Sequence, residues 1–335
     1  MTMKDRSQNK HPHKRRPMPV PKLPRPLRDA NGPIRPQAVA GAPQPPATHW
    51  GEVAEWYDQL VGEEGSEYHR EVVLPGALRL LGAKAGDHVV DIACGQGVLC
   101  RTLARQGVLT TGIDAAQDLI RHAKDRNAQL MKSTGTNPPA SPPPTHCPLP
   151  TYHTADVRDL PFLRDDEYTA AACLLAMQNL NPISPVCATV ARVLKPMGRF
   201  VIVMMHPCFR GAKESSWGWD EKAKVQYRRV DRYLLPRKVP IITHPGINKD
   251  YTWTFHKPIE SYVKSLRNAG LLVDALEEWP SHKTSTSGPR APAENVARKE
   301  IPMFLALRAV KIPGVALSGD GDSSESTTDD APEPA

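Results

Sequence analysis

The sequence predicts an α/β fold: a doubly wound, mostly parallel sheet of seven strands with an antiparallel last strand. Patterns typical of strands and helices alternate along the middle of the chain, beginning with the apolar run 88–94 and the helical spacing of 97–107. Such alternation indicates parallel strands covered by helices. The last two predicted strands, 271–279 and 303–312, have no long helix pattern between them, which favours an antiparallel pair at the end of the sheet.

The other elements are predicted from the spacing of their apolar residues. His88–Cys94 is a near-continuous apolar run closed by glycine, as expected for a strand buried on both faces. The other predicted strands are 109–114, 152–157, 168–177 and 198–206, and the other predicted helices are 116–131, 183–196 and 258–270.

Three loops interrupt this pattern. The segments 207–254 and 281–302 follow the carboxyl ends of strands, where open parallel sheets bind their ligands. The proline-rich segment 133–150 falls on the opposite side and is expected to be a surface insertion. We refer to residues 207–254 as the insert and expect it to cover the substrate.

Both ends of the chain are predicted to be disordered tails, leaving 49–318 as the folded domain. Residues 1–48 hold ten Lys and Arg against two acids, interspersed with prolines, and 319–335 hold six acids and no base. The basic arm can be read as a tether to RNA, DNA or an acidic partner, or as a solubilising extension. Because much of the basic surplus lies in the arm, the high pI does not make the folded domain a nucleic-acid binder.

Cysteine usage and hydropathy indicate a cytoplasmic protein. The six cysteines form no CxxC pair, which suggests reduced, structural thiols, and His206 with Cys208 would not complete a metal site. No apolar run approaches the roughly 20 residues that cross a bilayer, and the N-terminus lacks the apolar segment of a signal peptide. We therefore predict no metal and no membrane partner, and the oligomeric state stays open.

A glycine-rich turn follows the first predicted strand. In VVDIACGQG, Val89–Gly97, the residues Gly95 and Gly97 allow the backbone to approach a ligand closely at the start of a helix. A dinucleotide-binding fingerprint needs a third glycine where this chain has Cys100. The turn therefore argues against NAD or FAD.

Three acids lie within or at the ends of the first three predicted strands. Asp91 lies inside the glycine motif, where it would repel a pyrophosphate but suits a cationic amino group. Asp114 ends the second strand, where a carboxylate can accept both ribose hydroxyls, and Asp156 ends the third strand near the position of an adenine. Together these residues fit a cationic nucleoside.

The stretch Val89–Lys195 resembles class I S-adenosylmethionine-dependent methyltransferases, in the group that includes quinone and small-molecule methylating enzymes. The acid-x-G-x-G-x-G motif of that family appears as DIACGQG, in which Ala93 replaces the first glycine at what we take to be the least demanding position, and Val193–Phe200 matches the turn before the fifth strand. The resemblance implies S-adenosylmethionine as the cofactor, bound by Tyr57, Asp91, Cys94, Gly95, Gly97, Asp114, Ala115, Asp156, Val157 and Met177.

Within this assignment, Asp91 is expected near the methionine amino group, Asp114 on the ribose, and Asp156 with Val157 at the adenine. The segment 49–81 resembles the capping helices of these enzymes, and Tyr57 within it is either a lid contact or an aromatic that packs the cap on the sheet.

Catalysis in this family is an in-line transfer of a methyl group, which needs a general base only when the acceptor must lose a proton. His206 ends the fifth predicted strand and is the candidate base, although a structural role would suit it as well. In the insert, Trp217 and Trp219 are expected to wall an apolar or aromatic acceptor. The predicted substrate residues also include Arg210 and Arg228, which with Arg229 and Arg232 could bind an anionic group or form a solvated face.

The sequence thus favours methyl transfer to a small-molecule acceptor. One alternative is an RNA or other nucleic-acid methyltransferase aided by the basic arm. The residues after the fourth strand read MQNLNP, which lacks the NPPY-like pattern of amino-methylating DNA enzymes. A second alternative is a non-catalytic interaction protein that retains the fold, against which the intact acids and glycines argue.

Overall fold

The computed structural model describes residues 50–133, 147–242 and 251–314, which all belong to one compact unit, residues 47–335. The predicted basic arm 1–48, the predicted acidic tail 319–335 and most of the predicted proline-rich insertion lie outside the described residues.

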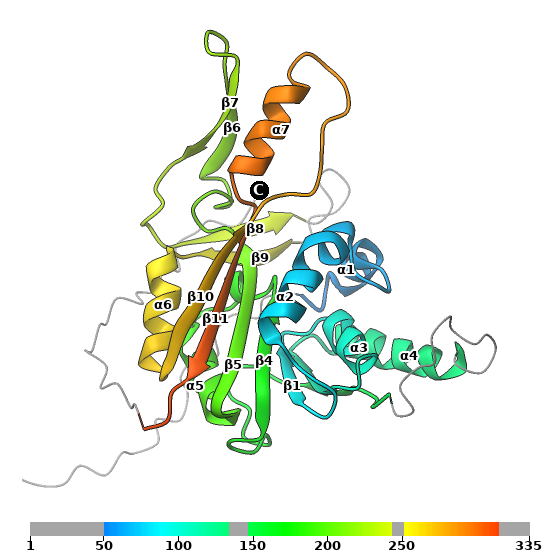
Figure 1. Ribbon diagram of the computed structural model, residues 1–335. Coiled ribbons are helices and arrows are strands. Elements are labelled where there is room, and N and C mark those ends of the chain that lie inside the picture. The colour runs from blue at the N-terminus through cyan, green and yellow to red at the C-terminus, as the bar shows by residue number, and fades with distance from the viewer. Residues whose placement is uncertain (1–49, 134–146, 243–250, 315–335) are drawn as a thin grey trace, which may run out of the picture. The chain divides into compact units, whose positions relative to one another are not determined.

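A seven-stranded sheet forms the centre of this unit, in the order β10-β11-β5-β4-β1-β2-β3 (Figure 1). Strands β1 to β5 run parallel, and β11 is antiparallel to both of its neighbours, β5 and β10. The predicted fold class is therefore confirmed. The strand bounds are β1 His88–Ile92, β2 Leu109–Asp114, β3 Thr151–Thr154, β4 Tyr168–Leu174, β5 Leu194–Met205, β10 Leu271–Trp279 and β11 Phe304–Lys311.

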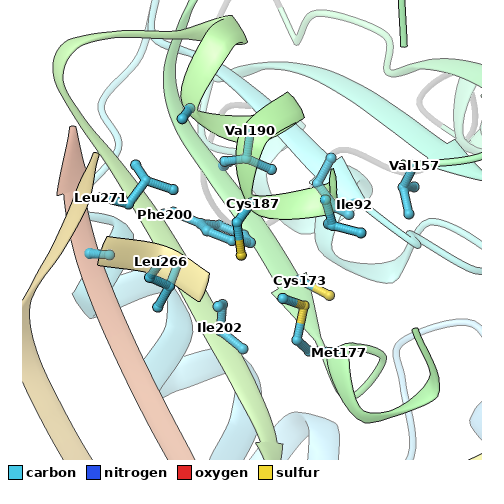
Figure 2. Packing of buried hydrophobic residues seen from close by; sticks show 14 of the residues in the cluster. Ile92, Val157, Cys173, Met177, Cys187, Val190, Phe200, Ile202, Leu266 and Leu271 are labelled. Carbon is cyan, nitrogen blue, oxygen red and sulfur yellow. The ribbon is translucent and has the colours of Figure 1, made fainter. Parts of the chain in front are cut away.

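Helices cover both faces of the sheet because neighbouring residues of each central strand point to opposite sides. In β1, Val90 belongs to the apolar cluster that includes Val190 of α5 and Leu266 of α6, and Figure 2 shows part of this cluster. Val89 belongs to the cluster on the other face, with residues of α2 and α3. The helix bounds are α1 Ala54–Val61, η1 His69–Val73, α2 Leu74–Leu81, α3 Val98–Ala104, α4 Gln117–Ser133, η2 Met177–Asn179, α5 Ser184–Val193 and α6 Ile259–Asn268.

The insert forms two antiparallel hairpins, β6 (Ser215–Asp220) with β7 (Val225–Val230) and β8 (Arg237–Ile242) with β9 (Tyr251–His256). A helix missed by the sequence prediction, α7 (Ala291–Glu300), lies beside the β6–β7 hairpin (Figure 1). Since α7 buries only Ala291 and Ala297, it has no apolar stripe that sequence periodicity could reveal.

No helix in the described parts of the chain combines the length and the apolar composition needed to cross a bilayer. Within the same residues, no group of three or more His, Cys, Asp and Glu side chains is arranged as a metal site.

Tyr152 of β3 packs beneath the glycine-rich turn. A Cβ atom at Gly97 would lie 2.3 Å from its hydroxyl, and one at Gly112 would lie 2.6 Å from Cδ1 of its ring. Both glycines are thus required by the ring of Tyr152, in addition to the backbone freedom that Gly97 needs at φ 78°. The Tyr152 hydroxyl is buried and has no hydrogen-bond partner among the described residues.

We expect Tyr152→Phe to raise the free energy of unfolding by about 1 kcal/mol, because it removes a buried hydroxyl whose hydrogen bond to water is not replaced. Tyr233→Phe is the matched control, since the Tyr233 hydroxyl accepts a hydrogen bond from the Ile259 N–H at 2.9 Å. The control should lose about 1 kcal/mol. Urea denaturation measures both, and a loss of stability in Tyr152→Phe would contradict the expectation.

Candidate active site

The turn after β1 is built from three residues in the left-handed backbone region. Ala93 and Gly95 both have φ 54°, and Gly97 has φ 78°. The sequence analysis took Ala93 to lie at the least demanding position of the motif. The left-handed backbone of Ala93 contradicts that interpretation. A side chain in this region meets the following carbonyl, which costs about 1–2 kcal/mol, and glycine avoids that cost.

Asp114, at the end of β2, holds this turn in place. Its Oδ2 accepts a hydrogen bond from the Gly95 N–H at 2.8 Å, and its Oδ1 accepts one from the Ala116 N–H at 2.8 Å. Burial raises the pKa of Asp114, and the two N–H donors oppose that shift. A carboxylate offers about four lone-pair positions, so Asp114 can accept two more hydrogen bonds, as many as a ribose diol donates.

Asp91, on β1, is the second buried carboxylate of the turn. The Cys100 thiol donates a hydrogen bond to its Oδ2 at 3.4 Å. Burial raises the pKa of Asp91 to about 7, Cys100 lowers it, and the nearby Asp114 raises it further. Among the described residues, neither Asp91 nor Asp114 has a cationic partner in an ion pair. Two buried acids with no counter-charge favour a cationic ligand.

Tyr57, on α1, lies over the same turn. Its Cε1 is 3.4 Å from the position of a Cβ atom at Gly95. Burial raises the pKa of Tyr57, and Asp114 and Asp91 add to the shift. The next residue, Asp58, accepts a hydrogen bond from Nη2 of Arg126 at 2.8 Å and so ties α1 to α4. The cap is thereby fixed where Tyr57 contacts the turn.

The other predicted cofactor residues do not all lie at the turn after β1. Cys94 and the exposed Ala115 adjoin the turn and Asp114. Asp156 follows β3, and its carboxylate is held by the Nε atom of Arg158 at 2.8 and 2.9 Å, which lowers the pKa of Asp156.

The side chains of Val157 and Met177 lie in the apolar core, where Figure 2 shows Met177 beside Cys173. Only their backbone or a change of rotamer would bring these two residues to a ligand.

His206 lies just after β5 and is 1% exposed. Its Nδ1 accepts hydrogen bonds from the N–H groups of Cys208 and Phe209 at 3.2 and 3.4 Å, which places the proton on Nε2. Nε2 then donates to Glu278 of β10 at 2.8 Å. Since both ring nitrogens are occupied, this arrangement favours a structural role over the predicted role as general base. Burial lowers the pKa of His206, and Glu278 opposes the shift.

The predicted substrate residues divide into two groups. Trp217 lies 5.0 Å from the guanidinium of Arg210 and 5.0 Å from that of Arg228. Trp219 is engaged elsewhere, because Arg290, the residue before α7, lies 4.7 Å from its ring and its N–H donates to Glu221 at 2.6 Å. The structure therefore brings Arg210, Trp217 and Arg228 together and leaves Trp219 out.

Comparisons with known proteins agree with this geometry. A family model described as a methyltransferase domain matches residues 90–202. Over 178 residues the chain is 29% identical to a demethylmenaquinone methyltransferase of Tropheryma whipplei, a match that covers 52% of this chain and 61% of the relative. Over 205 residues it is 32% identical to a 2-phytyl-1,4-naphtoquinone methyltransferase of Trichormus variabilis, covering 60% of this chain and 76% of the relative. The chain belongs to the class I S-adenosylmethionine-dependent methyltransferases.

The methyltransferase family also accounts for the fold. A solved S-adenosylmethionine dependent methyltransferase from Mesorhizobium loti has a TM-score of 0.52 and 23% identity, over 70% of this chain and 96% of that chain. The predicted family is thus confirmed, and the cofactor of this family is S-adenosylmethionine, as predicted. The chain spans about three fifths of the length of the T. whipplei relative, and the family model ends before the insert.

Two features of this methyltransferase escaped the sequence analysis. Cys100 counted there only as a missing glycine, whereas its thiol is the hydrogen-bond partner of Asp91. Tyr68, at the start of η1, stacks edge-on against His282 and Phe304, which are more than 200 residues away in the chain. No local pattern could have indicated a contact over that separation.

We expect Ala93→Gly to raise the free energy of unfolding by about 1 kcal/mol, because glycine relieves the left-handed strain. Ala176→Gly is the control, since Ala176 has an ordinary φ of −121°. It should lose about 0.4–1 kcal/mol through the greater freedom of the unfolded chain. Chemical denaturation of both variants tests this, and equal effects of the two changes would count against strain at Ala93.

Asp91 also makes stability depend on pH. Its pKa of about 7 in the folded protein exceeds the ordinary value of 3.8, so the folded protein keeps a proton that the unfolded chain releases from about pH 4 upward. The stability contributed by protonated Asp91 is complete below pH 4 and is lost as the pH rises to 7. Relative to wild type, Asp91→Asn should gain up to about 4 kcal/mol between pH 4 and pH 8. Urea denaturation without cofactor measures this difference in stability at each pH. A difference between Asp91→Asn and wild type that does not change with pH would contradict the expectation.

Proposed function

We propose that this chain binds S-adenosylmethionine at the carboxyl ends of β1 and β2 and transfers its methyl group to a small-molecule acceptor. The observation that supports this proposal best is the pair of buried carboxylates, Asp91 and Asp114, beside a left-handed glycine turn with no cationic partner among the described residues. A cationic nucleoside satisfies both acids, whereas a dinucleotide would place its phosphates against Asp91.

The residues of the turn fit the cofactor in the following way. Asp114 accepts the ribose hydroxyls while it remains bonded to the Gly95 and Ala116 N–H groups. Asp91 lies near the amino group, and Asp156 is positioned for the adenine once its pairing with Arg158 is shared or exchanged. Tyr57 covers the turn and limits water at the bound cofactor.

When bound, S-adenosylmethionine supplies a methyl group on a sulfonium, and the protein's part is to align it with the acceptor. Fixing two reactants in an in-line geometry can lower the activation barrier by about 7–11 kcal/mol. No general base is assigned, because the hydrogen bonds of His206 to Glu278, Cys208 and Phe209 occupy both of its nitrogens.

A small-molecule acceptor is supported by the quinone methyltransferases among the relatives. A cytoplasmic location is part of this proposal, and it is supported by the six cysteines, all of which are free thiols. The nucleic-acid alternative was prompted by the arm 1–48, which lies outside the described residues, and by the arginines of the insert.

Calorimetry with S-adenosylmethionine tests the proposal directly. Wild-type protein should bind it, and Asp114→Ala should weaken binding by about 100-fold or more, because two charge-assisted hydrogen bonds of roughly 1.5–3 kcal/mol each are lost. Asp274→Ala is the matched control, since Asp274 is an ion-paired carboxylate on the edge strand β10. Failure of wild type to bind the cofactor would falsify the proposal, and equal affinities of wild type and Asp114→Ala would remove Asp114 from the ribose.

A further inference from the structure

We propose that the acceptor carries an oxyanion, a carboxylate or a phosphate, that is bound by Arg210 and Arg228 beside Trp217. This inference rests on the proposed function, because it names the class of acceptor for the same methyl transfer. The proposed anion site consists of three of the predicted substrate residues, and we call it the Arg210–Trp217–Arg228 group.

Arg210 is held in position by the turn that follows β5. Its backbone N–H donates to the carbonyl of His206 at 2.7 Å, and the His206 ring fixes the same turn through the N–H groups of Cys208 and Phe209. The guanidinium of Arg210 therefore projects from the carboxyl end of a central strand. Its Nε is buried and has no hydrogen-bond partner among the described residues.

Arg228, on β7, is oriented by the same turn. Its Nε donates to the Phe209 carbonyl at 2.8 Å, and its Nη2 donates to the Ser215 hydroxyl at 2.7 Å. Because these bonds use one side of the guanidinium, Nη1 remains to bind a ligand. Trp217 lies 5.0 Å from both guanidiniums and so keeps the two arginines near one another.

The two arginines lack the counter-charge that their neighbours have. Across the described residues, no carboxylate forms an ion pair with Arg210 or Arg228, although both are partly buried. Burial lowers the pKa of each, and the nearby Arg228 lowers that of Arg210 further. By contrast, acids pair with Arg79, Arg126, Arg192, Arg229, Arg237 and Arg308.

Two half-buried cations without a counter-ion are costly, and a bound oxyanion would offset that cost. Guanidinium groups bind carboxylates and phosphates through paired hydrogen bonds in a fixed plane, which makes this ligand class a better match than a neutral one.

The turn that carries Arg210 adjoins the start of β11, because the N–H of His206 donates to the Met303 carbonyl at 2.9 Å. Tyr68 contacts Phe304 at the start of β11, directly beside Met205 at the end of β5. The Arg210–Trp217–Arg228 group therefore belongs to the same end of the sheet as the cofactor turn.

An apolar surface lies along this end of the sheet. Partly buried side chains that pack on one cluster include Tyr57, Tyr68, Leu174, Leu175 and Met205. Tyr57 contacts the cofactor turn, and Tyr68 contacts Phe304, which pairs with Met205 at the end of β5. An acceptor with an apolar or aromatic body and one anionic end fits this sequence of contacts.

The test uses the full chain with two anionic probes, benzoate and phenyl phosphate, and one neutral probe, benzyl alcohol. Binding is followed by tryptophan fluorescence, because Trp217 adjoins both arginines. We expect the anions to bind more tightly than the alcohol, and the stronger of the two identifies the oxyanion. Arg210→Gln should weaken anion binding by about 10-fold or more, with partial recovery in Arg210→Lys.

Arg229→Gln is the matched control, because Arg229 is the next residue on β7, is 68% exposed and pairs with Asp231. It should leave probe affinity unchanged. Equal binding of anions and alcohol, or equal losses in the Arg210 and Arg229 variants, would overturn the inference. S-adenosylmethionine calorimetry on each variant verifies folding and separates the two proposals, since cofactor binding without probe binding refutes only this one. Probe binding without cofactor binding refutes the proposed methyl transfer and leaves an anion site.

Discussion

The site depends on one buried carboxylate. Asp114 accepts the Gly95 N–H with one oxygen and the Ala116 N–H with the other, so a single side chain fixes the turn after β1 and the start of α4. The turn itself is unfavourable, because it holds Ala93 in the left-handed region and encloses Asp91 without a counter-charge. The hydrogen bonds of Asp114 hold this strained turn in place at the end of the sheet.

The glycine turn and its buried acids could be predicted because their determinants are contiguous. A strand, a glycine turn and a strand-end acid must follow one another in a parallel sheet, and the chain has them between residues 88 and 114. The parallel arrangement of β1 to β5 and the antiparallel β11 were predicted from the alternation of elements, whereas the order of the strands in the sheet was not. The pattern could not indicate where side chains point. The side chain of Met177 lies in the core, and both ring nitrogens of His206 form hydrogen bonds.

The sequence named Arg210, Trp217 and Arg228 as candidate substrate residues, but it could not predict the contacts around them, because these join distant segments. His206 bonds to Glu278 across 72 positions, and Tyr68 meets His282 across an even longer separation. The helix α7 was missed for a related reason: it has little apolar surface of its own and packs beside a hairpin that the sequence did not resolve into strands. Charge alone could not separate the arginines either, since only the structure shows that Arg229 has an acid partner and Arg210 has none among the described residues.

The position of β11 determines the order in which the strands of the sheet can pair during synthesis. β11 is the last strand in the described residues, yet it lies between β5 and β10, and within these residues β10 pairs with no other strand of the sheet. As the ribosome releases the chain, β1 to β5 can pair as soon as they emerge, whereas β10 must wait without a neighbour. The β10 side of the sheet can therefore form only after residue 311 has left the ribosome, later than the turn between β1 and α3.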